Sequence, residues 1–220
     1  MKRIDINSPA KINLDLKIFE KNDHGYHNIE TSFQYIDLFD HMTFEVSERG
    51  ISIQSNKSFL ENKDNTIYKS AKSLIHLTNS KKGINITIEK NIPVGAGLGG
   101  GSSNAASTII TLNKLWGLNL TKNKLMDIAK EIGADVPFFI HGENAYGSGI
   151  GDKLKSKLPI KDKILLIYPK INNSSSEMYH LLDIQRGDNI EKSHHKQNDF
   201  WNVFFDKNNQ INEFYELISP

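Results

Sequence analysis

The sequence predicts an α+β protein with a β-rich N-terminal domain, a glycine-rich phosphate loop and a shortened C-terminal α/β portion. Three observations support this fold class. Apolar and polar residues alternate through much of the first 53 positions, helix-periodic segments follow from residue 65, and a stretch with five glycines joins a predicted strand to a predicted helix. The 220 residues provide enough core for one large domain or two small ones.

Composition and charge exclude several classes of protein. Apolar residues make up 38% of the chain and charged residues 24%, which is typical of a soluble globular protein. A net charge of +1 argues against nucleic acid or an anionic membrane as a partner. The absence of cysteine excludes disulfides, thiolate catalysis and cysteine–zinc sites. With no apolar leader and no 18-residue apolar run, we expect a cytoplasmic protein; the oligomeric state is not indicated.

The first predicted strand covers residues 3–19, where apolar side chains from Ala10 to Ile18 alternate with polar ones. The polar face carries Lys11 and Asn13, two residues apart. The pattern alone favours a solvent-exposed strand face for both side chains.

A glycine turn over residues 23–27 is predicted to join this strand to a second one over 29–36. Tyr26 and His27 lie in the turn. They are either hairpin surface or a stacking and hydrogen-bonding pair for a planar ligand, and the pattern alone favours the surface.

Three more strands and a helix are predicted before the glycine-rich stretch. Alternation at 42–46 and 51–53, with a glycine turn between, indicates an antiparallel hairpin. Asn65 is most simply the cap of a helix that begins there. Isoleucines at alternate positions over 84–88 indicate a strand that leads into the glycine-rich stretch.

Two helices are predicted after that stretch. Apolar residues from Ala105 to Trp116 recur at helical spacing, and Gly117 ends this helix. Thr121 begins the second helix, and Gly133 occupies a position typical of a left-handed C-terminal cap.

Asp135 follows this second helix directly and precedes an apolar segment. Because a proline disfavours the helical conformation in the residue before it, Pro137 predicts an extended Val136. Asp135 is therefore either a turn former or a partly buried functional carboxylate, and the pattern leaves both possibilities open.

The remainder of the chain predicts a domain boundary near residue 158. Residues 147–152 are expected to be a loop, and a hydrophilic linker follows over 153–163. Ile164–Tyr168 is an apolar run that suits a buried strand. We therefore expect an N-terminal domain of residues 1–158 and a C-terminal portion of residues 159–220.

Within the C-terminal portion, helical segments are predicted at 178–182 and 200–205. The pair His194–His195 has no third ligand at metal-binding spacing, and we interpret it as surface.

The glycine-rich stretch Pro93–Ala106 predicts a site for an anion. Glycine removes side chains from a backbone that a ligand must approach closely. Ser102, Ser103 and Asn104 follow at the mouth of a helix, where backbone amides are free. Such a loop is typical of phosphate binding.

Two common phosphate-binding patterns do not fit. A P-loop requires a lysine where Gly101 stands. A dinucleotide-binding loop needs an acidic residue about twenty positions further on, yet no Asp or Glu occurs from Asn91 to Met126. The loop therefore needs a cation and an acid/base group from elsewhere in the chain. Lys11 and Asp135 are the natural candidates.

The stretch resembles the central motif of the GHMP kinases, the superfamily of galactokinase, homoserine kinase and mevalonate kinase. The glycine loop indicates only the superfamily. The pieces at 10–13 and 25–27 are similar to those members that phosphorylate a hydroxyl of a cytidine-diphosphate-linked methylerythritol in non-mevalonate isoprenoid synthesis. The resemblance rests on collinear segments at 8–14, 25–27, 64–65, 92–106 and 133–137.

The resemblance implies an ATP- and Mg²⁺-dependent kinase. It implies that Asp135 acts as catalytic base on the substrate hydroxyl, with Lys11 close by to keep the aspartate ionised and to stabilise developing phosphate charge. The adenosine would lie near Asn65 and Lys90. The Ser103 hydroxyl, or that of its neighbour Ser102, would reach Mg²⁺. The residues implied to hold the ATP phosphates are Pro93, Val94, Gly95, Ala96, Gly97, Leu98, Gly99, Gly100, Gly101, Ser102 and Ser103.

The resemblance also implies a small-molecule, cytidine-diphosphate-linked substrate. Tyr26, His27 and Phe33 would surround the cytosine, and Asn13 would lie near the erythritol or diphosphate end. Tyr179 is a further candidate for a substrate contact.

One departure concerns the C-terminal portion. The family normally carries a third glycine-rich motif there, and no glycine follows Gly187. The C-terminal domain is therefore predicted to be incomplete or reduced. Two alternative functions follow: another small-molecule kinase of the superfamily, or a non-catalytic nucleotide-binding protein.

Overall fold

The computed structural model describes residues 2–79, 81–171, 173–187, 197–211 and 215–216. They form two compact units. Unit 1 comprises Met1–Ile12, Tyr35–Val94 and Leu98–Asn144, and unit 2 comprises Asn13–Gln34, Gly95–Gly97 and Ala145–Pro220. Because each unit is discontinuous along the chain, the boundary near residue 158 between functional domains stays a prediction.

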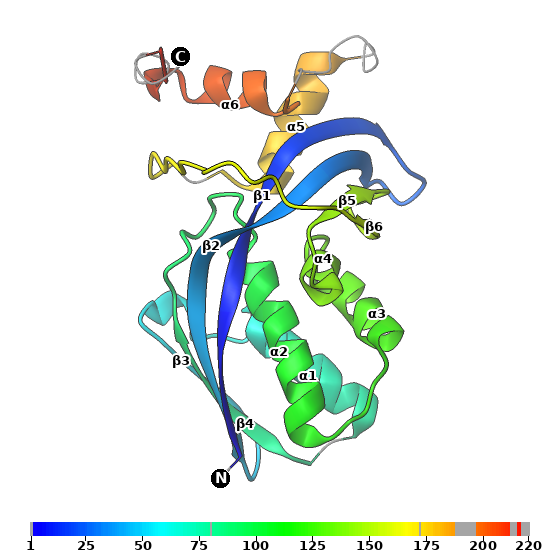
Figure 1. Ribbon diagram of the computed structural model, residues 1–220, viewed down its shortest axis with the longest axis vertical. Helices are drawn as coiled ribbons and strands as arrows, with labels where there is room; N and C mark the ends of the chain where they lie inside the picture. Colours follow the sequence, from blue (N-terminus) through cyan, green and yellow to red (C-terminus); the bar gives the residue numbers. More distant parts are fainter. Residues whose placement is uncertain (1, 80, 172, 188–196, 212–214, 217–220) are drawn as a thin grey trace. The chain divides into compact units, whose positions relative to one another are not determined.

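Two long strands contribute residues to both units. Strand β1 (Arg3–Lys21) pairs with β2 (His27–Ser47) (Figure 1). The predicted first strand and glycine turn are confirmed. The Asn22 side chain closes the turn by accepting hydrogen bonds from the amides of His24 and Tyr26. Strand β2 is continuous where the sequence predicted two strands, at 29–36 and 42–46.

The predicted hairpin between residues 42–46 and 51–53 is wrong. In unit 1, β4 (Gly83–Glu89) lies between β2 and β3 (Ile51–Ser55), antiparallel to β2 and parallel to β3 (Figure 1). Ile84, Ile86 and Ile88 of β4 are at most 1% exposed. A strand with so apolar a face gains most from the centre of a sheet, where neighbours cover it on both sides.

Four α-helices complete the described part of unit 1: α1 (Thr66–Thr78), α2 (Gly100–Trp116), α3 (Lys122–Ile132) and α4 (Val136–His141). A short 3-10 turn, η1 (Ser58–Leu60), precedes them. Helix α2 packs against α1, α3 and α4, and its predicted apolar positions from Ala105 to Trp116 are buried. Within the described residues, no helix is both long enough and apolar enough to cross a membrane.

The backbone around Asp135 differs from the prediction. Gly133 has φ 173°, which is extended backbone, so it is no left-handed cap. Val136 is the first residue of α4 and not extended, with Pro137 in the first turn of that helix. Proline is tolerated there because its missing amide would have no partner inside the helix. Asp135 thereby becomes the N-terminal flanking residue of α4.

Unit 2 contains a hairpin that the sequence did not predict. Strands β5 (Ala145–Ser148) and β6 (Lys153–Ser156) pair with each other, and β5 pairs with β2 at Thr31–Phe33. Four-residue strands around a glycine-rich turn carry too few alternating positions to be recognised. Both helical segments predicted in the C-terminal portion are present. The segment at 178–182 lies within helix α5 (Ser175–Arg186), and that at 200–205 corresponds to helix α6 (Trp201–Lys207). The 3-10 turn η3 (Asn209–Ile211) follows α6.

Unit 2 has its own apolar cluster. Residues of β1 and β2 pack there against α5 and α6, and a buried ion pair between Arg186 and Asp199 lies at 2.7 Å. The members of the cluster are Leu16, Ile18, Ile29, Met178, Leu182 and Val203.

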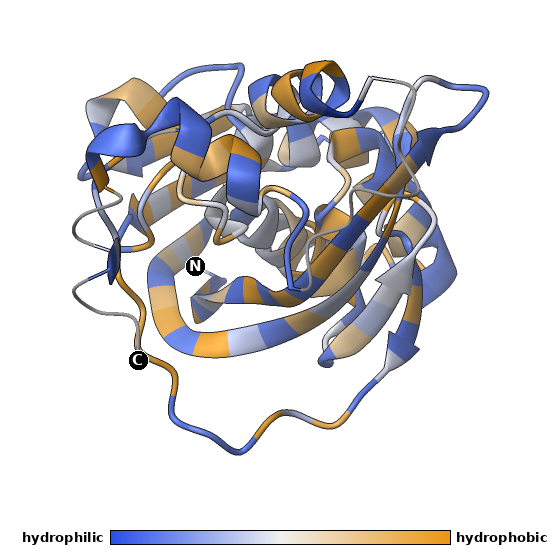
Figure 2. Ribbon diagram, turned by 90° about the horizontal axis from the view of Figure 1, so that it is seen from above, coloured by the Kyte–Doolittle hydropathy of each residue, from blue (hydrophilic) through white to orange (hydrophobic). Residues whose placement is uncertain are grey.

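The predicted buried strand at Ile164–Tyr168 is wrong. This segment has no helix or strand, and Leu165 is 84% exposed. Figure 2 shows the chain that follows β6 as an extended loop without helix or strand. An apolar run becomes a buried strand only if a neighbouring strand pairs with it, which is a non-local condition. The predicted surface pair His194–His195 lies outside the described residues.

We expect Leu182→Ala to lower the free energy of unfolding by about 2–5 kcal/mol, because it leaves a cavity among apolar side chains. Leu182 is 2% exposed, whereas Ile184 on the same helix is 66% exposed. Ile184→Ala is the matched control, with an expected change within about 0.5 kcal/mol. Urea denaturation measures both. Equal effects of the two variants would contradict the packing of α5 against β1 and β2.

Candidate active site

The glycine-rich loop has the backbone geometry of an anion-binding turn. Gly95, Gly97 and Gly99 have φ values of 73°, 74° and 67°, which only glycine adopts readily. Gly99 is the N-terminal cap of α2 and supplies no side chain to the first-turn amides. Those amides and the positive end of a 17-residue helix are therefore available to an anion.

Lys11 and Asp135, both in unit 1, form an ion pair at 3.3 Å between the lysine Nζ and the Asp135 Oδ2. The Lys11 side chain is 5% exposed, and its backbone amide donates to the Leu98 carbonyl at 3.0 Å. Lys11 is thus not on a solvent-exposed strand face. The Asp135 side chain keeps 35% of its surface exposed, so a ligand can reach it.

Gly99 allows this close approach. A side-chain carbon on Gly99 would come within 3.0 Å of the Lys11 stem and of the Phe139 ring. Phe139 belongs to α4, the helix that begins directly after Asp135. Lys11, α4 and the end of the loop at Gly99 are therefore packed against one another in unit 1.

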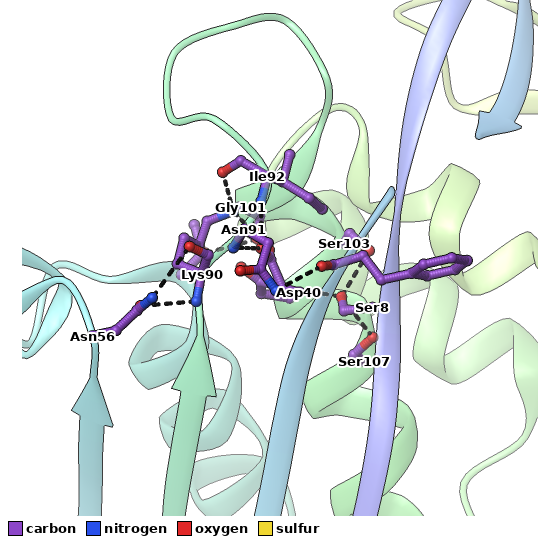
Figure 3. Close-up of polar contacts among 12 residues, drawn as sticks. Ser8, Asp40, Asn56, Lys90, Asn91, Ile92, Gly101, Ser103 and Ser107 are labelled. Carbon is purple, nitrogen blue, oxygen red and sulfur yellow. Dashed lines mark hydrogen bonds and ion pairs between the residues drawn. The ribbon is translucent and has the colours of Figure 1, made fainter. Parts of the chain in front are cut away.

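Beneath the loop, the carboxylate of Asp40 accepts four hydrogen bonds and has no exposed surface (Figure 3). Its Oδ1 accepts from the amides of Asn91 and Ile92, both at 2.8 Å. Its Oδ2 accepts from the Lys90 ammonium at 2.6 Å and from the Asn104 side-chain amide at 2.9 Å. Nothing in the sequence pattern marks Asp40, because its partners lie 50 to 64 positions further along the chain.

Lys90 was expected to lie toward the adenosine, but the structure turns its side chain inward. The side chain is 4% exposed, and its ammonium donates to Asp40 and to the Ile92 carbonyl. Burial lowers the pKa of Lys90, while the hydrogen bond and charge of Asp40 act in the opposite direction. The side chain therefore holds the segment that leads into the glycine loop.

Ser103, the predicted magnesium ligand, is also directed inward. It has no exposed surface, and its hydroxyl lies 2.8 Å from that of Ser8. The Ser8 hydroxyl in turn accepts from Asn104 and Ser107, both at 3.1 Å (Figure 3). The adjacent Ser102 is only partly buried.

Asn65 caps α1, as its sequence context predicted. Its side-chain oxygen accepts from the Ile67 amide at 2.9 Å, and its side-chain nitrogen donates to the Leu60 carbonyl. The next residue, Thr66, donates to the Gly101 carbonyl at 2.9 Å. The start of α1 is thereby joined to the start of α2.

The predicted substrate residues belong to unit 2 and differ in their surroundings. Tyr26 is 62% exposed, whereas Phe33 is 1% exposed and packs beneath Gly147 of β5. Asn13 is half-buried and donates to the Thr31 hydroxyl at 2.7 Å. Tyr26 is therefore open to a ligand, while the Phe33 ring is part of the core.

The His27 ring is held between two acceptors. Its Nδ1 lies 2.7 Å from the Phe19 carbonyl, and its Nε2 lies 3.0 Å from Asp183. Tyr179, the further candidate for a substrate contact, stacks on this ring at 5.0 Å. Burial alone would raise the pKa of Asp183, but the hydrogen bond from Lys21 and the interactions with His27 lower it. Sequence reasoning missed Asp183, since a carboxylate on a helix face carries no distinguishing signal.

Residues 65–143 match the family described as the GHMP kinases N terminal domain. This range contains the glycine loop, α2 and Asp135. The α+β fold and the loop-to-helix site beside the Lys11–Asp135 pair thus define a protein of the GHMP kinase class.

The relatives point to one family within that class. The 4-diphosphocytidyl-2-C-methyl-D-erythritol kinase of Francisella philomiragia is 41% identical over 208 residues, covering 91% of this chain and 76% of that relative. Its counterpart in Aliivibrio salmonicida is 44% identical over 78% of this chain and 60% of its own length. A crystal structure of 4-(cytidine 5'-diphospho)-2C-methyl-D-erythritol kinase is similar with a TM-score of 0.75 and 25% identity, over 97% of this chain and 81% of that one. The chain belongs to the 4-diphosphocytidyl-2-C-methyl-D-erythritol kinase family.

The match does not extend over the whole length of these relatives. The chain spans 60% of the Aliivibrio salmonicida kinase and 66% of the one from Syntrophus aciditrophicus.

Tyr35 of unit 1 supplies a test of how α4 is held. Its ring stacks on Phe138, and its phenol donates to the Phe138 carbonyl at 3.3 Å. Burial raises the pKa of this phenol above its ordinary value of 10.0. Tyr35 therefore contributes stability below pH 10.0, which is lost as the pH rises further and only the unfolded chain ionises.

We expect the free energy of unfolding to fall less steeply above about pH 10 in Tyr35→Phe than in the wild type, because the variant lacks this titration. Urea denaturation between neutral and alkaline pH measures the slope. Tyr26→Phe, at an exposed position, is the control and should keep the wild-type slope. An unchanged slope in Tyr35→Phe would contradict a buried, protonated phenol.

Proposed function

We propose that the chain is a cytoplasmic, ATP-dependent kinase that phosphorylates a hydroxyl of 4-diphosphocytidyl-2-C-methyl-D-erythritol. The observation that carries this proposal is the Lys11–Asp135 pair at 3.3 Å, held in unit 1 against the glycine loop at the start of α2. The names of relatives at 41% and 44% identity supply the substrate. The absence of cysteine fits a reducing compartment.

In the proposed reaction, Asp135 accepts the proton of the substrate hydroxyl. The freed oxygen attacks the γ-phosphorus of ATP, the bond from that phosphorus to the bridging oxygen breaks, and ADP leaves with the electron pair. Lys11 stabilises the negative charge of Asp135 before the transfer and that of the transferred group during it. The exposed third of the Asp135 side chain leaves room for the hydroxyl.

The glycine loop would hold the triphosphate by backbone amides. Phosphoryl transfer depends mainly on positioning and electrostatic stabilisation, so a rigid set of donors supplies much of the catalysis. The left-handed Gly95, Gly97 and Gly99 orient successive amides, and the first turn of α2 adds its own. The cap of α1 at Asn65 would face the adenosine side of the same loop.

Mg²⁺ is the proposed metal, and the residues present fit it. Among the described residues, no group of three His, Asp or Glu side chains could hold a metal by itself. Mg²⁺ in kinases is usually held by few protein groups together with substrate phosphates. Ser102, a partly buried residue, fits this role better than the fully buried Ser103. When bound, Mg²⁺ neutralises charge on the phosphates.

On the substrate side, we propose that Tyr26 and His27 of unit 2 recognise the cytosine. Tyr26 presents an exposed aromatic face for stacking. His27 and Tyr179 form a stacked pair whose orientation Asp183 and the Phe19 carbonyl fix. Asn13 would lie near the erythritol or diphosphate end, and the buried Phe33 would support the site from within.

We expect Asp135→Asn to lower kcat/KM by about 10²- to 10⁴-fold, because the amide cannot accept the hydroxyl proton. The affinity for a non-hydrolysable ATP analogue should stay close to that of the wild type. Coupled ADP release with the cytidyl substrate measures turnover. Asp127→Asn, which removes an exposed carboxylate on α3, is the matched control and should keep full activity.

Other outcomes of this assay separate the alternatives. Full activity of Asp135→Asn would contradict its role as the base. Wild-type protein that binds the ATP analogue but transfers no phosphate would be a nucleotide-binding protein. Turnover with a different alcohol, and none with the cytidyl substrate, would indicate another GHMP-type kinase.

We expect Tyr26→Ala to raise KM for the cytidyl substrate about tenfold, since loss of aromatic stacking on a base typically costs about 1–3 kcal/mol. KM for ATP should be unchanged. Tyr26→Phe keeps the ring and should behave like the wild type. Steady-state kinetics with each substrate varied in turn measures both constants, and equal rises in both would contradict a cytosine contact.

A further inference from the structure

We propose that Asp40 is the positioning residue of the phosphate loop and sets the affinity for ATP without touching it. This inference rests on the proposed function, because it assumes that the loop binds the triphosphate. All the contacts that carry it lie in unit 1, among residues outside the Lys11–Asp135 pair.

Asp40 joins the entrance of the loop to the helix at its exit. Its Oδ1 accepts from two consecutive amides, Asn91 and Ile92, just before the loop begins. Its Oδ2 accepts from Asn104, in the second turn of α2 just after the loop ends. One carboxylate therefore sets the distance between the segment that enters the loop and the helix α2 that follows it.

Lys90, which follows β4 directly, is the third segment that Asp40 holds. Its ammonium donates to Asp40 at 2.6 Å and to the Ile92 carbonyl at 2.9 Å. Its backbone amide donates to the Asn56 side chain at 2.8 Å (Figure 3). The end of β4 is thereby fixed at the point where it becomes the loop.

Gly100, the first residue of α2, lies against Lys90 and Ile92. A side-chain carbon there would come within 2.7 Å of the Lys90 Nζ and 2.9 Å of Ile92. A displacement of the Lys90–Asp40 pair would therefore move the first turn of α2. The amides of that turn are the ones that would hold phosphate oxygens.

Only a carboxylate satisfies all four donors. An asparagine at position 40 has one oxygen, which could still accept from Asn91 and Ile92. Its amide nitrogen would then face Lys90 and Asn104, which are donors in this arrangement. The hydrogen bond from Asn104 of α2 would be lost or reoriented, while the volume of the side chain at position 40 would stay the same.

The test is Asp40→Asn, with the dissociation constant of a non-hydrolysable ATP analogue measured by titration calorimetry. We expect this constant to rise by about tenfold or more, because hydrogen bonds to a buried charge are lost. In steady-state kinetics, KM for ATP should rise while KM for the cytidyl substrate and kcat change less than twofold. A purely structural role would lower the melting temperature and leave this split absent.

Asp199→Asn is the matched control. Asp199 is also a buried carboxylate, 3% exposed, that pairs with a buried cation and accepts a backbone amide, that of Ile18. It belongs to unit 2, whereas Asp40 and the four donors to its carboxylate belong to unit 1. We expect a comparable loss of melting temperature and an unchanged affinity for the ATP analogue.

If Asp40→Asn does not fold, Asn104→Ala tests the same inference, since it removes the hydrogen bond from α2 to Asp40, together with that to Ser8, and keeps the Lys90–Asp40 ion pair. Its dissociation constant should also rise. An unchanged constant in the folded variant, or an equal rise in Asp199→Asn, would overturn the proposal. Wild-type protein that binds the analogue without phosphorylating the cytidyl substrate would overturn the proposed function alone. Wild-type protein that does not bind the analogue would overturn both.

Discussion

The buried carboxylate of Asp40 is the interaction on which the phosphate-loop region of unit 1 depends. A charge removed from water is stable only when donors replace its hydration, and breaking such an arrangement is far more costly than losing a surface contact. Here the donors come from the end of β4, the entrance of the loop and α2. Satisfying one charge therefore organises three segments. The hydroxyls of Ser8, Ser103 and Ser107 extend the same polar network from β1 into α2.

The Lys11–Asp135 pair differs from Asp40 in that one of its two charged groups is open to solvent. Its two members lie 124 positions apart and meet because β1 places Lys11 against the loop, while α4 begins directly after Asp135. The lysine is buried and the aspartate is partly exposed. That asymmetry suits catalysis, because the cation stays fixed while the carboxylate remains open to a reacting hydroxyl. Gly99 is required for this arrangement, since a side chain there would displace the lysine stem or Phe139.

Sequence patterns correctly predicted the elements that depend only on residues close together in the chain. The alternation of β1, the glycine turn at 23–27, the cap at Asn65 and the apolar face of α2 all depend on neighbouring residues, and the structure confirms them. Two predictions of strand pairing, which need a distant partner, were wrong. Residues 51–53 pair with β4 and not with β2, and among the described residues Ile164–Tyr168 forms no strand. Short strands such as β5 carry too few residues to show any period.

The sequence by itself determined the chemical inventory: a glycine loop without its own lysine, and Lys11 and Asp135 as candidates for the missing cation and base. It also determined the family, because those residues occur in fixed order along the chain. Only the tertiary structure decided which of the candidate side chains are buried and which are exposed. Lys90 and Ser103 carry groups suited to ATP and Mg²⁺, yet the fold uses both inside the protein, paired with Asp40 and Ser8. The reason is that burial and pairing depend on residues far away in the chain, which no local spacing records.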